Sequence, residues 1–307
     1  MRAAALLLAG LMPLQAAHFY VTVAGLGGEA EYEQRFAAWV QEIDKILRAS
    51  GGDARVVTLS GPEATRERVR AALEKAAREC AAEDALVLML IGHGTYDGVE
   101  YKFNLPGPDL SGVELARLLD AIPAGRQLVV NMTSASGASL AALQKENRIV
   151  ITATRSGMQK DATVFPRYWI GALRDPAADT DKTEVTTALE AYRYADQHTV
   201  KFFETQKRLA SEHALLEDTG RGEGVRTPSA ENGRGLRAAA FPLVRFGQAQ
   251  VAAKDPEKRK LLARKEDLEQ RIDQLKYQKA AMPLEEYRKQ LAALLLELAK
   301  TQAEIDR

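Results

Sequence analysis

Apolar runs alternate with stretches of helical periodicity along the first half of the chain. The apolar runs are rich in strand-forming residues and occupy residues 19–24, 54–59, 85–91, 127–131 and 148–153. Between them, apolar residues recur at helical spacing over residues 31–47, 65–83 and 111–119. Continuous apolar strands separated by helices are typical of a parallel sheet that is buried on both faces. The pattern predicts a three-layer α/β domain with a mostly parallel sheet.

The pattern changes after this alternating region. Residues 160–209 are predicted to be mainly helical, with one helix at 165–173 and a longer stretch at 184–209. Residues 218–235 contain five glycines among polar residues, which favours a long mobile surface loop. A strand at residues 240–245 is expected to return the chain to the sheet.

The last fifty residues are dominated by Lys, Glu, Gln, Ala and Leu. Two apolar stripes run along them at alternating spacings of three and four, with Pro283 and two acidic residues between the stripes. This pattern predicts a helical hairpin with coiled-coil character. It is compatible with packing on the main domain or on another chain. The first stripe comprises Leu261, Leu268, Ile272 and Leu275, and the second Tyr287, Leu291, Leu294, Leu298 and Ile305.

The amino-terminal residues have the composition of an export signal. Arg2 precedes an apolar run over residues 3–12, and the small pair Ala16 and Ala17 follows at a position suited to cleavage. The run is too short to span a bilayer, so no membrane span is expected in the mature chain. We therefore expect residues 1–17 to be a signal peptide and the protein to be exported, periplasmic or secreted.

Charge and cysteine content narrow the function classes. The 307 residues include 42 basic and 42 acidic side chains, so the chain lacks the basic excess of nucleic-acid-binding proteins, and no nucleic acid is expected as a partner. Cys80, the single cysteine, lies in a predicted helix and is expected to be a small packed residue. One thiol can form neither an internal disulfide nor a thiolate metal site.

The first candidate for chemistry is a histidine between two glycines. His93 follows the apolar strand 85–91 directly, at the edge of an open α/β sheet where ligands usually bind. Flanking glycines allow the sharp turn that exposes an imidazole, and the amide of Gly94 could face a developing oxyanion.

The second candidate follows the next strand. After residues 127–131 the chain continues through Thr133, Ser134, Ser136 and Gly137. These hydroxyls are expected at the same sheet edge as His93, where one of them could act as a nucleophile. Small polar residues after a strand are also ordinary turn formers.

Together these segments resemble the caspase–legumain clan of cysteine peptidases. The resemblance rests on the His93-Gly94 pair, the Ser136-Gly137 pair and the following strand 149–156, and it extends to bacterial legumain-like (C13) relatives through residues 25–36 and 211–218. It covers roughly residues 19–245. The resemblance implies a caspase-like fold and a cysteine–histidine dyad that cleaves peptide bonds, with the oxyanion held by backbone amides.

The nucleophile of that clan is missing from this sequence. Alignment on Ser136-Gly137 puts Ser134 at the cysteine position, whereas alignment on Asn131 puts Thr133 there. A serine hydroxyl, unlike a thiol, needs a well-placed base that is usually oriented by a third group. Asp97 is the nearest nominal acid to His93.

Weaker signals lie elsewhere. Asp179, Asp181, Thr183 and Glu190 occupy positions one, three, five and twelve of a calcium-loop pattern, but position six is Glu184 rather than glycine, which favours a capped helix start. His198 and His213 have no metal-ligand spacing. No metal and no cofactor is expected.

The sequence therefore predicts a caspase/legumain-like domain at residues 18–250 and a helical hairpin at 255–307. The leading interpretation is a pseudopeptidase that binds a peptide or protein ligand through the former active-site cleft, with an oligomer or partner contact through 255–307. One alternative is a serine-dependent peptidase in which Ser134 attacks, His93 takes the proton and the amides of Gly94 and Ser134 hold the oxyanion. Another is an envelope scaffold that acts through the hairpin.

Overall fold

The structure, a computed structural model, describes residues 17–50, 54–229 and 232–306. Apart from its last residue, the predicted signal peptide lies outside the described residues. The eleven strands of the described part are β1 His18–Ala24, β2 Ala54–Leu59, β3 Ala85–Ile91, β4 Gly94–Tyr96, β5 Tyr101–Phe103, β6 Leu110–Ser111, β7 Arg126–Asn131, β8 Arg148–Thr152, β9 Val185–Thr187, β10 Leu215–Glu217 and β11 Pro242–Arg245. Its α-helices are α1 Ala30–Ala49, α2 Arg66–Glu79, α3 Gly112–Asp120, α4 Leu140–Leu143, α5 Phe165–Arg174, α6 Ala188–Thr205, α7 Leu236–Ala239, α8 Gly247–Ala252, α9 Pro256–Gln278 and α10 Leu284–Ile305.

A six-stranded sheet forms the centre of the domain, in the order β10-β8-β7-β3-β1-β2. Five strands run parallel, and β10 pairs antiparallel with β8 at one edge. Every residue of β3 is buried, as expected for a strand covered on both faces. The predicted α/β class with a mostly parallel sheet is confirmed.

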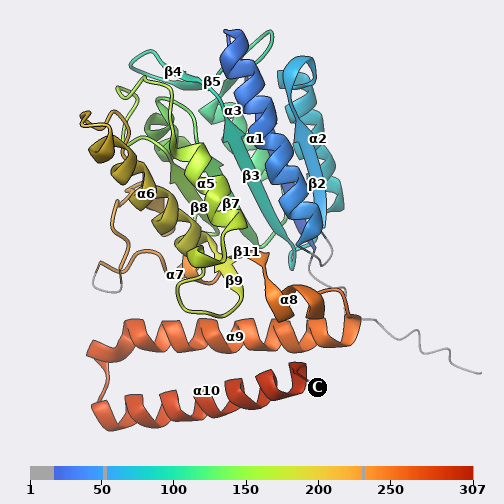
Figure 1. The fold of residues 1–307 in the computed structure, drawn as a ribbon, viewed down its shortest axis with the longest axis vertical. Helices are drawn as coiled ribbons and strands as arrows, with labels where there is room; N and C mark the ends of the chain where they lie inside the picture. The colour runs from blue at the N-terminus through green and yellow to red at the C-terminus, as the bar shows by residue number, and fades with distance from the viewer. Residues whose placement is uncertain (1–16, 51–53, 230–231, 307) are drawn as a thin grey trace, which may run out of the picture.

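Helices cover both faces of this sheet (Figure 1). One apolar core joins the sheet to α1, α5 and α6, and a second joins the opposite face to α2, α3 and α4. The parallel strands all end at one edge, and α9 and α10 lie across the other edge (Figure 1). Loops at the carboxyl edge therefore meet each other, far from the hairpin.

Two small sheets were not expected from the sequence. The strands β4, β5 and β6 form a three-stranded antiparallel sheet directly after β3. The strand expected at residues 240–245 forms as β11, but it pairs with β9 in a separate two-stranded sheet, so the expectation that it returns to the main sheet is wrong. The place beside β8 is already taken by β10.

The described parts of the glycine-rich segment, residues 218–229 and 232–235, are held by buried polar contacts, against the expectation of a mobile loop. The fully buried Glu217 accepts hydrogen bonds from the amides of Thr219 and Gly220, and Arg234 lies 3.4 Å from its carboxylate. Asp218 accepts from the amide of Gly235 at 3.0 Å. Charge-assisted bonds of this kind fix a backbone that has few apolar side chains.

The C-terminal helical hairpin forms as predicted, and α9 packs on the domain. Leu268, Ile272 and Leu275 of the first stripe are buried. Glu266 of α9 binds Arg245 of β11 with N–O distances of 3.0 and 2.5 Å. The helix α10 packs mainly along α9 (Figure 1).

Candidate functional site

The two sequence candidates lie at the carboxyl edge of the central sheet, as predicted. His93 and Gly94 follow β3, and residues 132–137 follow the neighbouring strand β7. The two segments approach so closely that a Cβ atom on Gly94 would lie 2.5 Å from the carbonyl oxygen of Ser134. A glycine at position 94 is therefore required by packing between the loops.

Ser134 is buried and bonded to the histidine loop through its hydroxyl. Its Oγ accepts from the amide of Gly94 at 3.1 Å and donates to the carbonyl of the same residue at 3.1 Å. The side chain is only 2% exposed. In this arrangement the Gly94 amide donates to Ser134, whereas the serine mechanism considered from the sequence needs the same amide for the oxyanion.

Thr133, the other residue considered for the nucleophile position, belongs to a buried network. Its hydroxyl lies 2.7 Å from the hydroxyl of Tyr101 in β5 and donates to Asn131 Oδ1 at 2.8 Å. The hydroxyl of Tyr101 lies 3.2 Å from the same Asn131 oxygen, and burial raises its pKa well above the ordinary value. A hydroxyl with these fixed partners has no open path to a substrate.

Ser136 is also enclosed. Its Oγ accepts from the amide of Thr154 at 3.1 Å, and its carbonyl accepts from Ser139 at 2.7 Å. Between Ser134 and Ser136, the fully buried Ala135 has a positive φ of 55°. Such a conformation costs a non-glycine residue about 1–3 kcal/mol and persists only where surrounding contacts impose it.

His93 is half-buried against the first helix of the domain. Its ring packs edge-on against Tyr32 and Phe36, with centroid distances of 4.8 and 5.3 Å. Burial lowers the pKa of His93, while a hydrogen bond with the Gly27 backbone and the charge of Glu29 act in the opposite direction. Burial therefore favours the neutral form of the imidazole.

The Ser134 hydroxyl and the His93 imidazole have different hydrogen-bond partners, Gly94 and the Gly27 backbone respectively. In the part of the chain that the structure describes, no hydrogen bond connects the imidazole to the Ser134 hydroxyl. Asp97 does not orient the histidine either, because its carboxylate accepts from the amides of Val99 and Glu100 at 2.9 and 2.8 Å.

A second histidine, His213, lies at this edge just before β10. The Nδ1 of His213 lies 2.6 Å from the side-chain amide of Gln159, and the backbone carbonyl of Gln159 accepts from the amide of Ala135. His213 is thereby linked to the Ser134 loop by one residue. The neighbouring Glu212 accepts from the amides of Val164 and Phe165 at the start of α5, and burial raises its pKa to about 7.

Exposed apolar side chains surround this edge. They lie in the loop after β1, in the β4–β5 connection, in the loop after β8 and in the loop before β10. Exposed apolar residues are ordinary when isolated, whereas a contiguous group of them indicates a contact surface. The exposed fractions are 41% for Leu26, 90% for Val99, 74% for Met158 and 96% for Leu209.

The acidic residues of the calcium-loop pattern lie close together, and hydrogen bonds at the start of α6 account for their positions. Ligand oxygens of Asp179, Asp181 and Glu190 lie within 4.8 Å of one another. Glu190 and Thr187 form a capping box at the start of α6, while Asp179 accepts from the amides of Thr183 and Glu184. These contacts fit the capped helix start that the sequence favoured.

The remaining sequence candidates lie away from this edge. Cys80 is a buried residue at the carboxyl end of α2, and burial raises its pKa to about 12, so its reactive thiolate is disfavoured. His198 of α6 packs between the rings of Tyr168 and Tyr194.

Among the described helices, none combines the length and apolarity that a bilayer span requires.

Comparisons with known proteins give structural neighbours only. No family model and no curated protein matches the chain. A Geobacter sulfurreducens protein, GSU0716, aligns over 72% of this chain and 97% of its own, at 14% identity and a TM-score of 0.47. The Drosophila initiator caspase Dronc aligns over 68% of this chain and 82% of its own, at 8% identity and a TM-score of 0.44. The protein drICE aligns over 62% of this chain and 85% of its own, at 8% identity and a TM-score of 0.40. With TM-scores of 0.40 to 0.47 and identities of 8 to 14%, these alignments assign the chain neither a family nor an activity.

Proposed function

We propose that this chain is a caspase/legumain-like pseudopeptidase that binds peptide segments of other proteins at the carboxyl edge of its sheet. The proposal joins the sequence resemblance, carried by the His93-Gly94 and Ser136-Gly137 pairs, to the geometry of the same loops. The protein would bind a peptide segment without cleaving its peptide bonds.

The main support for the proposal is the burial and hydrogen bonding of the Ser134 hydroxyl. A serine nucleophile needs a base within hydrogen-bond reach and an unobstructed approach to the substrate. Here the hydroxyl is buried and makes two hydrogen bonds to Gly94, and the imidazole of His93 packs on Tyr32 and Phe36. The Ser134 proton is thus directed at the Gly94 carbonyl rather than at an imidazole nitrogen.

Binding is supported by the apolar residues around the edge. Val99, Met158 and Leu209 are more than two-thirds exposed on three different loops. Peptide recognition commonly combines main-chain hydrogen bonds with apolar contacts to side chains. We therefore infer that the ligand is an extended peptide segment carrying apolar side chains.

Export is part of the same proposal. It rests on the sequence of residues 1–17, in which Arg2 precedes an apolar run and small residues follow. Intact-mass measurement of the protein from its native host, after separation of the cell fractions, tests it. A mature chain that begins near Ala17 in an exported fraction supports export, and a full-length chain in the cytosol contradicts it.

Binding and cleavage are separated by one set of variants. The purified protein and the variants Val99→Ser and Met158→Ser are offered an immobilised peptide library, with Val251→Ser as a control that alters a 63% exposed apolar residue on α8. We expect uncleaved peptides with apolar side chains to be retained, and retention to fall about ten-fold in the first two variants only. Equal retention by all three variants would contradict binding at this edge.

The serine-dependent alternative makes the opposite prediction about chemistry. If Ser134 is the nucleophile, peptides in the same library are cleaved, and cleavage disappears in both Ser134→Ala and His93→Ala. The pseudopeptidase predicts no cleavage by any of the three proteins.

A further inference from the structure

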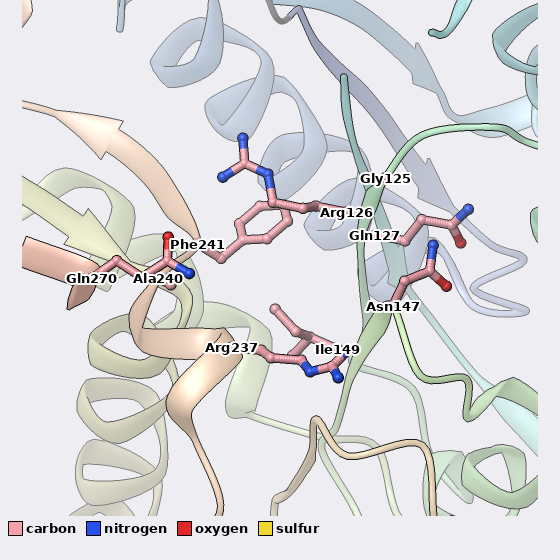
Figure 2. Close-up of a pocket in the computed structure, with 9 residues that line it drawn as sticks. All are labelled: Gly125, Arg126, Gln127, Asn147, Ile149, Arg237, Ala240, Phe241 and Gln270. Atoms are coloured by element: carbon pink, nitrogen blue, oxygen red, sulfur yellow. The ribbon is translucent and has the colours of Figure 1, made fainter. Parts of the chain in front are cut away.

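Carboxylates gather where α9 packs on the domain. A cavity of about 40 Å³ lies between α9, the strands β9 and β11 and the end of α7. Ala240 and Gln270 line both this cavity and the neighbouring hollow that Figure 2 shows, where α9 meets the domain. None of the residues that line the cavity is cationic. The acidic residues among them are Asp181 of the domain and Glu266, Glu269 and Asp273 of α9.

Two of the three acidic residues that α9 contributes have a close cationic partner. Glu266 accepts hydrogen bonds from Arg245 at 3.0 and 2.5 Å, and its charge also acts on Arg126. Asp273 has the ammonium group of Lys276 at 2.8 Å. The negative charges of Glu266 and Asp273 are therefore compensated in the packed state.

Glu269 is less well compensated, although it lies only three residues after Glu266. Within the described residues, its one ion-pair partner is Lys265, at 3.9 Å, which is beyond hydrogen-bond distance. The Lys265 ammonium group also donates to the backbone carbonyl of Thr183 at 3.1 Å. The Glu269 side chain is only 23% exposed, so water compensates its negative charge poorly.

The charge that faces Glu269 from the domain is also negative. Asp181, in the segment before β9, lines the same cavity, and in the described part of the chain no cation lies within ion-pair distance of it. Oxygens of Asp179 and Glu190 lie within 4.8 Å of its carboxylate. Because Asp181 is an exposed residue, solvent screens part of its repulsion. Burial is therefore the main cost of ionising Glu269, and repulsion by Asp181 adds to it.

The packing of α9 is thereby linked to a proton on Glu269. Burial raises the pKa of Glu269 to about 7, Lys265 opposes this rise, and the three other acidic residues of the cavity add to it. When α9 leaves the domain, the carboxyl group returns toward its ordinary pKa of 4.5. The packed state therefore binds the proton more tightly than the open state. Packing consequently weakens as the pH rises from about 4.5 to about 7.

We propose that ionisation of Glu269 beside Asp181 loosens the packing of α9 on the domain, so that the helical hairpin is held more tightly in acid than above neutral pH. The neutral carboxyl group fits the small cavity, whereas the carboxylate is poorly solvated there and faces like charge. This device lies away from the carboxyl edge of the sheet, where peptide binding is proposed. Either proposal can therefore fail without the other.

Hydrogen exchange of the α9 amides in the full chain, followed by mass spectrometry at about pH 5 and about pH 8, measures this opening. Rates are corrected for the intrinsic pH dependence of exchange, and EDTA in every buffer prevents a divalent cation from bridging the carboxylates. A pKa of 4.5 in the open state and about 7 in the packed state allows up to about 70-fold more opening at the higher pH. We expect an increase of about ten-fold or more, since an opened helix need not expose Glu269 completely.

Three variants of α9 separate this mechanism from a general effect of charge. Glu269→Gln should remove most of the pH dependence and reduce opening at the higher pH by about ten-fold. Glu266→Gln should act in the opposite direction and increase opening at both pH values, because Arg245 loses its carboxylate partner. Asp267→Asn is the matched control: this exposed residue of the same helix pairs with Arg271 at 3.8 Å, and its variant should exchange like the wild type.

Amides of the buried strand β3 report opening of the whole domain and should not respond to Glu269→Gln. The proposal is overturned if corrected exchange of α9 in the wild type is equal at the two pH values. It is also overturned if Glu269→Gln exchanges at least as fast as the wild type at the higher pH, or if its β3 amides change as much as its α9 amides.

Discussion

Replacing Ser134 by alanine tests whether Gly94 holds its hydroxyl as the structure indicates. The change deletes two hydrogen bonds of 3.1 Å and leaves the amide and carbonyl of Gly94 without that partner between buried loops. A buried polar group without a partner costs about 1–3 kcal/mol. We therefore expect Ser134→Ala to lose roughly 2–4 kcal/mol of unfolding free energy.

The measurement is a urea unfolding curve followed by tryptophan fluorescence, with the midpoint and slope fitted for each protein. Ser156→Ala is the matched control, because the Ser156 hydroxyl accepts only a 3.3 Å bond from the amide of Met158 at the surface. That variant is expected to stay within about 0.5 kcal/mol of the wild type. If Ser134→Ala is also within 0.5 kcal/mol, the hydroxyl is not held by Gly94 and the reasoning against a serine nucleophile fails.

Three further predictions concern the regions around the site and the hairpin. Burial raises the pKa of Glu212 from 4.5 in the unfolded chain to about 7 in the folded protein. The folded protein therefore loses about 3 kcal/mol of unfolding free energy through this group as pH rises from about 4.5 to 7. Glu212→Gln should abolish this fall in the urea midpoint, and an equal fall in the wild type and the variant would contradict the prediction. Glu266→Gln should weaken the packing of α9 on the domain by about 1.5–3 kcal/mol, because Arg245 loses its carboxylate partner. Hydrogen exchange of the α9 amides measures this change, and exchange equal to that of the wild type would refute the role of Glu266. Gly137→Ala should lower the free energy of unfolding by about 2 kcal/mol or more, because the new Cβ atom would lie 2.3 Å from the backbone of Arg155. An unfolding free energy equal to that of the wild type in the same urea assay would show that these two loops are not packed so closely.

The strands of the main sheet were largely predictable, because a strand that is buried on both faces appears in the sequence as a continuous apolar run. The continuous apolar run at residues 85–91 is β3, and both capping residues, Thr65 and Ser111, begin the helices expected there. The last strand, β10, was missed because it has only three residues, Leu215–Glu217, too few for a periodic pattern. Its presence explains why β11 lies outside the sheet.

The position of the candidate site was predictable, but its hydrogen bonding was not. Strand ends at one sheet edge bring His93 and Ser134 onto adjacent loops, which the sequence order already implies. Which atoms the hydroxyl binds depends on loop conformation, including the positive φ of Ala135, and no residue type in the segment signals it. The link from His213 to the same loop through Gln159 joins residues 54 positions apart and leaves no local pattern.

A peptide-cleavage assay on the purified protein beside His93→Ala and Ser134→Ala tests directly whether Ser134 acts as a nucleophile. Each protein is incubated with a library of unstructured peptides, and new termini are detected by mass spectrometry. We expect no cleavage by the wild type, because Ser134 is bonded to Gly94 and no hydrogen bond among the described residues joins it to His93. Cleavage by the wild type that is lost in both variants would contradict this expectation and establish a serine-dependent peptidase.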